Sequence, residues 1–143
     1  MKKVLVTGAD GFIGRNLIKG LLKQGVEVHA IVYPGHNIYR GEEDPKLHVY
    51  SLDLNQILNH IADFPEDIDV MYHFAWNGVK PEVRNELDIQ IGNVNMSLDC
   101  MKLAIAIGIR KIIFPGSTNE YLYYGKPLNK DALPSPNNAY GAA

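Results

Sequence analysis

Residues 4–14 read VLVTGADGFIG, and this stretch decides the fold class. A short apolar run, Val4 to Val6, stops at a cluster of glycines, as a buried strand of a parallel sheet does. Apolar residues then recur at helical spacing until Gly25, where a helix C-terminus is expected. A glycine-rich loop between a first strand and a first helix is the context that a dinucleotide-binding fingerprint requires.

The three loop glycines have different predicted tasks. Gly8 permits a tight turn, Gly11 lets the backbone approach a pyrophosphate, and Gly14 allows the helix to pack closely on the strand. The helix N-terminus adds unpaired N–H groups and a partial positive charge. The alternative is that these glycines only form a tight turn, and their placement favours the phosphate site.

The rest of the chain alternates strands with helices. We expect four further strands, at 26–32, 47–52, 69–74 and 111–114. A short helix is expected before Pro65, and a long one ends near Gly108. The long helix is predicted from an apolar stripe that should face the core: Leu87, Ile91, Val94, Leu98, Met101 and Ile105. This alternation predicts one doubly wound α/β domain over residues 1–143, with strand order 3-2-1-4-5.

Composition restricts the partners of the chain. Its net charge of −2 supplies no general attraction for nucleic acid or an anionic membrane. The longest unbroken apolar run, residues 103–107, cannot span a bilayer, and the first seven residues lack a signal-peptide core. Cys100 is the only cysteine, which excludes an internal disulfide, fits the cytoplasm and indicates a buried core residue.

The histidines give no metal-binding pattern at helical spacing. None of the five forms an i, i+4 pair or a zinc motif that includes Glu, so we expect strand packing or solvation. The sequence therefore predicts no metal site.

The loop TGADGFIG resembles the extended short-chain dehydrogenase/reductase family, which includes nucleotide-sugar epimerases, dehydratases and reductases. This resemblance implies a Rossmann fold with NAD or NADP as cofactor. Other segments match along the chain: Asp53-Leu54 after the third strand, Phe74-Ala75-Trp76 after the fourth, and an Asn within the long helix. The resemblance implies these cofactor-binding residues: Gly8, Gly11, Phe12, Ile13, Gly14, Asp53, Leu54, Phe74, Ala75, Trp76 and Asn93.

The catalytic residues are also implied by the resemblance. Ser117, at the end of the fifth strand, matches the family's Ser/Thr position, and Thr118 is a second candidate if the register slips by one. Tyr140 matches the Tyr of Tyr-x-x-x-Lys. Ser117 would hydrogen-bond the substrate oxygen, while Tyr140 would transfer the proton as hydride passes to or from the nicotinamide.

The chain departs from the family pattern in two places. It stops at Ala143, before the Lys whose ammonium would activate Tyr140. We therefore expect a Rossmann part truncated before the C-terminal substrate-binding part, and no turnover by these residues alone. Tyr33-Pro34-Gly35 follows the second strand, where NAD-specific members place an Asp, and this weakly favours NADP.

The predicted function is the cofactor-binding part of an NAD(P)-dependent nucleotide-sugar epimerase or reductase. Asn119 stands where dehydratases of the family have Asp, which weakens the dehydratase interpretation. Two alternatives remain: a reductase of a non-sugar ketone, and a non-catalytic dinucleotide-binding regulator. Family members often form homodimers through two helices, one being the long helix. Asn95, Asp99 and Lys102, opposite the expected core stripe, are polar and do not predict such a homodimer.

Overall fold

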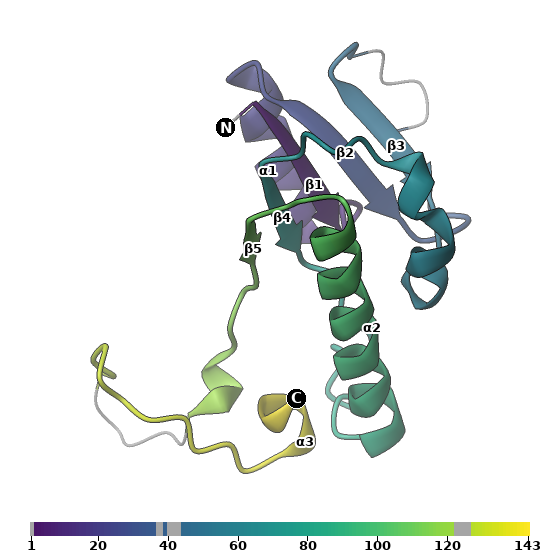
Figure 1. Cartoon of the computed structure of the whole chain (residues 1–143). Helices are drawn as coiled ribbons and strands as arrows, with labels where there is room; N and C mark the ends of the chain where they lie inside the picture. Colours follow the sequence, from purple (N-terminus) through teal and green to yellow (C-terminus); the bar gives the residue numbers. More distant parts are fainter. Residues whose placement is uncertain (1, 37–38, 40–43, 122–126) are drawn as a thin grey trace. The chain divides into compact units, whose positions relative to one another are not determined.

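A computed structural model describes residues 2–36, 39, 44–121 and 127–143 (Figure 1). The chain forms two compact units. Unit 1 comprises Met1–Ala75 with Asn95–Phe114, and unit 2 comprises Trp76–Val94 with Pro115–Ala143. The single domain predicted for residues 1–143 stays a prediction.

Unit 1 contains a five-stranded parallel sheet. Its strands are β1 (Lys3–Thr7), β2 (Glu27–Val32), β3 (Leu47–Ser51), β4 (Val70–His73) and β5 (Lys111–Ile113). Their spatial order is β3-β2-β1-β4-β5, and every adjacent pair is parallel. The predicted doubly wound α/β topology is therefore confirmed.

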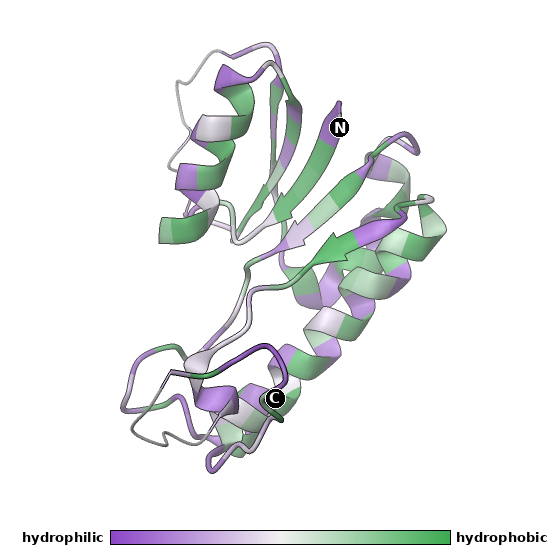
Figure 2. Ribbon diagram, turned by 90° about the vertical axis from the view of Figure 1, so that its left-hand side faces the viewer, coloured by the Kyte–Doolittle hydropathy of each residue, from purple (hydrophilic) through white to green (hydrophobic). Residues whose placement is uncertain are grey.

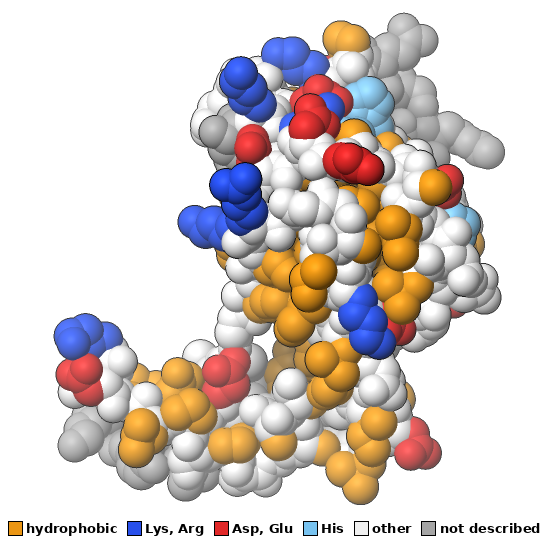
Figure 3. All heavy atoms as spheres, viewed as in Figure 1, with side chains coloured by type: hydrophobic (Ala, Val, Ile, Leu, Met, Phe, Trp, Pro, Cys, Tyr) orange, Lys and Arg blue, Asp and Glu red, His pale blue; other side chains and the backbone are white. Residues whose placement is uncertain are grey.

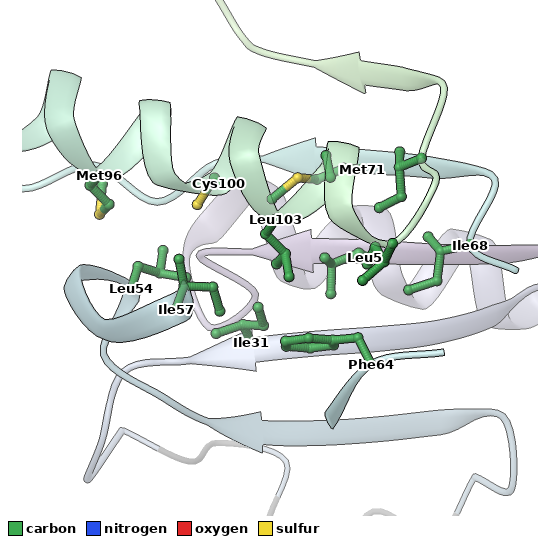
Figure 4. Packing of buried hydrophobic residues seen from close by; sticks show 13 residues of the cluster. Leu5, Ile31, Leu54, Ile57, Phe64, Ile68, Met71, Met96, Cys100 and Leu103 are labelled. Carbon is green, nitrogen blue, oxygen red and sulfur yellow. The ribbon is translucent and has the colours of Figure 1, made fainter. Parts of the chain in front are cut away.

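Helical segments cover both faces of this sheet. α1 (Phe12–Lys23) packs on one face through Ile18 and Leu21. The other face is covered by η1 (Leu54–Asp63), a 3₁₀ segment, and by the part of α2 (Leu87–Ala106) that belongs to unit 1. Figure 4 shows Met96, Cys100 and Leu103 of α2 in the core on this second face. The strands are mainly hydrophobic, whereas α1 alternates between hydrophilic and hydrophobic residues (Figure 2).

The end of α1 confirms the prediction made from Gly25. Gly25 has φ +74°, its N–H donates to the Leu22 carbonyl, and the Val26 N–H donates to the Leu21 carbonyl. This left-handed termination, which favours glycine, turns the chain directly into β2. Cys100 also lies where it was expected: it is fully buried, and burial, with a smaller contribution from Asp99, raises the pKa of its thiol to about 12.

The predicted orientation of α2 is wrong. All six residues of the apolar stripe are exposed, from 37% at Met101 to 78% at Ile105. Hydrophobic side chains are visible on the surface over α2 in Figure 3. We call this set the outer stripe of α2: Leu87, Ile91, Val94, Leu98, Met101 and Ile105.

The buried face of α2 is the less hydrophobic one. In unit 1 it carries apolar residues beside a serine: Met96, Ser97, Cys100, Leu103 and Ala104. In unit 2 it carries Gln90 and Asn93, both buried. These polar side chains can be buried because they hydrogen-bond other buried groups. The stripe of α2 with the strongest hydrophobic periodicity is therefore not the one that faces the core.

Unit 2 contains the first part of α2 and two short helical segments. These are η2 (Thr118–Glu120) and α3 (Ala139–Ala142), which pack against each other. Over the described residues of both units, no helix has the length and apolar content needed to cross a membrane.

Candidate functional site

The glycine loop after β1 is held against the end of β4. Gly8 has φ +62°, and a Cβ there would lie 2.6 Å from the Ala75 nitrogen and 2.7 Å from the Phe74 carbonyl carbon. The Phe74 N–H donates to the Thr7 carbonyl, and the Ala75 N–H donates to Thr7 Oγ1. Phe74 and Ala75, predicted from the segment after β4, are thus brought beside the loop.

Gly14 and Gly11 differ in what surrounds them. A Cβ on Gly14 would collide with the Gly8 carbonyl oxygen and lie 2.9 Å from Ala9 Cα, so this glycine lets α1 pack on the loop. Among the described residues, a Cβ on Gly11 would have one neighbour within 4 Å, the Gly8 carbonyl oxygen at 3.2 Å. Gly11 is the N-cap of α1 and offers no side-chain cap to its first N–H groups.

The start of α1 is open to solvent. Phe12 is 78% exposed and Ile13 is 54% exposed. The uncapped N–H groups of the first turn and the helix dipole favour an anion here. The arrangement therefore fits the phosphates of a dinucleotide, with Gly11 giving the closest approach to the backbone.

Tyr39 anchors the loop, a role that sequence reasoning missed. Its hydroxyl donates to the Ala9 carbonyl at 2.6 Å, and its side chain is buried. The Ala9 N–H in turn donates to the Ile31 carbonyl of β2. No spacing rule links Tyr39 to Ala9, because the two residues meet only after the chain passes through β2.

A row of buried, hydrogen-bonded polar side chains links the end of β1, just before the loop, to β4 and α2. His73 Nδ1 lies 2.8 Å from Thr7 Oγ1, and its Nε2 lies 3.0 Å from Ser97 Oγ. Hydroxyl groups can donate or accept, so both nitrogens of a neutral imidazole are satisfied. Burial lowers the pKa of His73 to about 4, which keeps the ring neutral at physiological pH.

Asp53 and Leu54 lie at the start of η1. Asp53 is its N-cap: Oδ1 accepts from the Asn55 N–H at 3.0 Å and from Asn55 Nδ2 at 2.9 Å. The Leu54 side chain is buried in the core. The structure thus gives Asp53 a capping role and directs Leu54 inward; the predicted contacts of both with the cofactor stay predictions.

Unit 2 contains a network centred on Asn93. Its amide accepts from the Asn77 N–H and donates to the Asn77 carbonyl, both at 2.9 Å. It also donates to Gln90 Oε1, which accepts from Trp76 Nε1 at 3.0 Å. Asn93 is fully buried with these partners, so it braces the segment after Trp76, and its predicted contact with a cofactor stays a prediction.

Gln90 is a residue that the sequence analysis did not identify. Its amide holds Trp76 and donates to the Arg84 carbonyl at 2.9 Å. The Trp76 ring in turn meets the Tyr140 ring edge to face, with centroids 6.4 Å apart. The available signal was three-residue spacing from Asn93, which places both amides on one helix face.

Ser117 is the N-cap of η2, four residues beyond the last residue of β5, and not at the end of that strand as predicted. Its Oγ accepts from the Asn119 N–H and from Asn119 Nδ2, both at 3.2 Å, and none of the described residues accepts a hydrogen bond from its own O–H. The Glu120 carboxylate accepts from the Ser117 N–H and completes a capping box. Thr118 is exposed and lies outside this arrangement.

Tyr140 is placed by the contact between η2 and α3. A Cβ on Gly141 would collide with the Asn119 carbonyl, so glycine is required for α3 to approach η2 this closely. Asn138 caps α3 by accepting from the Gly141 N–H at 2.8 Å. The elements that carry Ser117 and Tyr140 therefore lie side by side within unit 2.

Comparisons with known proteins agree with this description. The model of the NAD dependent epimerase/dehydratase family matches residues 4–143. A dTDP-6-deoxy-L-talose 4-dehydrogenase (NAD(+)) from Aggregatibacter actinomycetemcomitans is 26% identical, covering 98% of this chain and 50% of that protein. A UDP-glucose 4-epimerase from Lactobacillus helveticus is 30% identical over 97% of this chain and 43% of its own length.

A solved structure extends the similarity to three dimensions. MoeE5 in complex with UDP-glucose and NAD is 27% identical, with a TM-score of 0.78, covering 98% of this chain and 44% of that one. The chain thus spans about half the length of the relatives that it matches. The resemblance predicted from the glycine loop is confirmed: the chain belongs to the NAD dependent epimerase/dehydratase family.

Proposed function

We propose that this chain is the cofactor-binding part of an NAD(P)-dependent nucleotide-sugar epimerase or reductase. The observation that carries the proposal is the loop from Gly8 to Gly14, where glycine is sterically required at Gly8 and Gly14, and where Gly11 begins α1 without a side-chain cap on its first N–H groups. Relatives that bind or act on nucleotide sugars support the substrate class.

The cofactor would be held by unit 1. The first-turn N–H groups of α1 would bind the pyrophosphate, with Phe12, Ile13, Asp53, Phe74 and Ala75 as the further contacts. The bound nicotinamide would supply hydride transfer, while the protein supplies orientation and proton transfer.

The proton chemistry would belong to unit 2. The Ser117 hydroxyl is a free donor suited to a substrate oxygen, because Asn119 already occupies its acceptor side. Tyr140 would exchange a proton with that oxygen, with Trp76 and Gln90 fixing its ring. Asn119 is an amide engaged with Ser117, which favours an epimerase or reductase over a dehydratase.

A reductase of a non-sugar ketone and a non-catalytic regulator are the competing functions. A regulator that only senses dinucleotide has no need for a free Ser117 donor beside the helix that carries Tyr140. We also infer a cytoplasmic location, which the lone, buried Cys100 fits.

The cofactor choice is tested by titrating the chain with NADH and NADPH and following nicotinamide fluorescence. Both are expected to bind with affinities within about tenfold of each other, because Tyr33, 55% exposed, stands after β2 at the position where an Asp would repel a 2′-phosphate. If the preference for NADP predicted from Tyr33 holds, NADPH should bind more tightly than NADH. Tyr33→Asp should weaken NADPH about tenfold or more and leave NADH nearly unchanged.

Two glycine variants provide the matched control. Gly11→Ala should keep the fold and weaken both dinucleotides at least about tenfold, since its Cβ would occupy the phosphate approach. Gly20→Ala, with open space around its Cβ in the middle of α1, should bind as the unmodified chain does. Equal binding by all variants, or none by a folded sample, would contradict the assignment.

We propose in addition a homodimer formed through α2. The outer stripe is a run of exposed apolar side chains along one helix. Large exposed apolar surfaces are rare on monomeric proteins and mark interaction sites. A second copy of the chain would cover it with the same stripe, as a two-fold interface requires.

A further inference from the structure

Three metal-ligating side chains converge in unit 1, at the end of the strands opposite the glycine loop. They are Glu27, His29 and His48, which each offer one ligand atom, and these atoms lie within 4.8 Å of one another. We propose that this cluster binds a divalent transition-metal ion, with Zn²⁺ as the ion that its ligands fit best. The site goes beyond the proposed function and uses none of its residues.

Strand register creates the cluster. Glu27 and His29 are two residues apart on β2, so their side chains lie on one face of the sheet. His48 of β3 is the register partner of His29, which places it beside His29 on the same face. Sequence reasoning missed this set because it searched for helical i, i+4 spacing, whereas the signal was Glu-x-His on one strand.

The donor separations suit a small ion. His29 Nε2 is 3.3 Å and His48 Nε2 is 3.2 Å from the same oxygen, Glu27 Oε1. Zinc bonds of about 2.0–2.1 Å in tetrahedral geometry separate neighbouring donors by about 3.3 Å. The two imidazole rings are stacked with centroids 4.7 Å apart, so the exposed His48 ring must turn to direct its lone pair at the ion.

The buried ligand is already held in a suitable form. His29 Nδ1 lies 2.9 Å from the Tyr50 hydroxyl. When Nδ1 donates to Tyr50, the lone pair of Nε2 is free for a metal, and such outer contacts are typical of ligating histidines. Burial, with the neighbouring His48, lowers the pKa of His29 and favours the neutral ring that metals require.

Lys3 is the cation that competes for Glu27. Its Nζ lies 3.5 Å from Glu27 Oε1 and 2.8 Å from Asp67 Oδ1. Lys3 can therefore release Glu27 and remain paired with Asp67. Its charge still repels a bound cation, so Lys3→Met is expected to tighten metal binding.

Metal binding would join an edge strand to the interior of the sheet. β3 is at one edge and β2 is next to it, so one ion held by His48 and by Glu27 and His29 would cross-link the two strands. Two histidines and a carboxylate also leave a coordination position for water or another ligand, as in catalytic zinc sites.

Calorimetric titration of the tag-free chain with Zn²⁺ tests the proposal. One ion per chain should bind, Co²⁺ should give the visible absorption of a tetrahedral site, and Zn²⁺ should raise the melting temperature. His48→Gln, at a half-exposed position, should reduce the affinity for Zn²⁺ by about 10- to 100-fold.

His60→Gln is the matched control. His60 also contacts a carboxylate, Asp63 Oδ2 at 2.8 Å, but among the described residues that pair has no third ligand beside it, so its loss should leave the Zn²⁺ affinity unchanged. If His48→Gln fails to fold, Glu27→Gln replaces it with the same expected loss. Absence of Zn²⁺ binding, or equal affinity in the ligand and control variants, would overturn the proposal.

Discussion

At Gly8 a single backbone conformation joins the loop to the neighbouring strand. Its φ of +62° disfavours any side chain, and a Cβ would meet the backbone of Phe74 and Ala75, which cannot swing away. Gly8→Ala should therefore lower the free energy of unfolding by about 2–4 kcal/mol.

Gly20 is the control for this prediction. It lies within α1, and no atom of the described part of the chain comes within 4 Å of an added Cβ, so Gly20→Ala should stabilise the chain by about 0.5–1 kcal/mol. Urea unfolding of both variants gives the comparison. Similar changes at the two positions would mean that β4 does not press on Gly8 as described.

His73 should make stability depend on pH. Its pKa of about 4 in the folded chain lies below its usual 6.5, so between these values the unfolded chain binds a proton that the folded chain does not. The contribution of neutral His73 to the free energy of unfolding is complete above about pH 6.5. It falls by up to about 3 kcal/mol as the pH drops towards 4.

The test for His73 is urea unfolding between pH 7 and pH 4. His73→Gln keeps polar partners for Thr7 and Ser97 but cannot titrate, so its stability should fall less on acidification. His60→Gln removes a surface imidazole and should retain the full loss, because His73 is still present. Parallel curves for all three proteins would disprove the assignment.

Among the elements, α2 shows that hydrophobic periodicity alone does not identify the buried face of a helix; the surface on which the helix packs must also be known. Its outer stripe has the regular four- and three-residue steps expected of a core face, yet those residues are exposed. The buried face includes Ser97, which hydrogen-bonds His73, and Cys100. A helix with two usable apolar faces cannot be oriented from periodicity alone.

Two leucines of α2 test this orientation. Leu103 is fully buried and Leu98 is 47% exposed. Leu103→Ala should lower the free energy of unfolding by about 2–5 kcal/mol, because apolar surface is no longer buried and a cavity remains. Leu98→Ala should lower it by less than about 1 kcal/mol. Urea unfolding at low protein concentration gives both values, and a larger loss for Leu98 would reverse the assignment.

For the whole molecule, the outer stripe predicts self-association. Leu98→Lys combined with Ile105→Lys places charges on exposed positions, so folding should persist while sedimentation equilibrium changes from dimer to monomer. Leu133→Lys, at an exposed leucine that is not part of α2, should leave the dimer intact. A monomeric unmodified chain, or a dimer in every variant, would contradict an interface on α2.

The sequence by itself determined the parallel sheet, its strand order and the glycine loop, because these follow from local patterns: a short apolar strand, a glycine turn and a helix start at fixed spacing. The tertiary structure alone decided which face of α2 is buried, that Tyr39 anchors Ala9, and that His48 lies beside His29. These relations join residues far apart in the chain, and their energies depend on partners that become neighbours only when the strands pair and the helices pack.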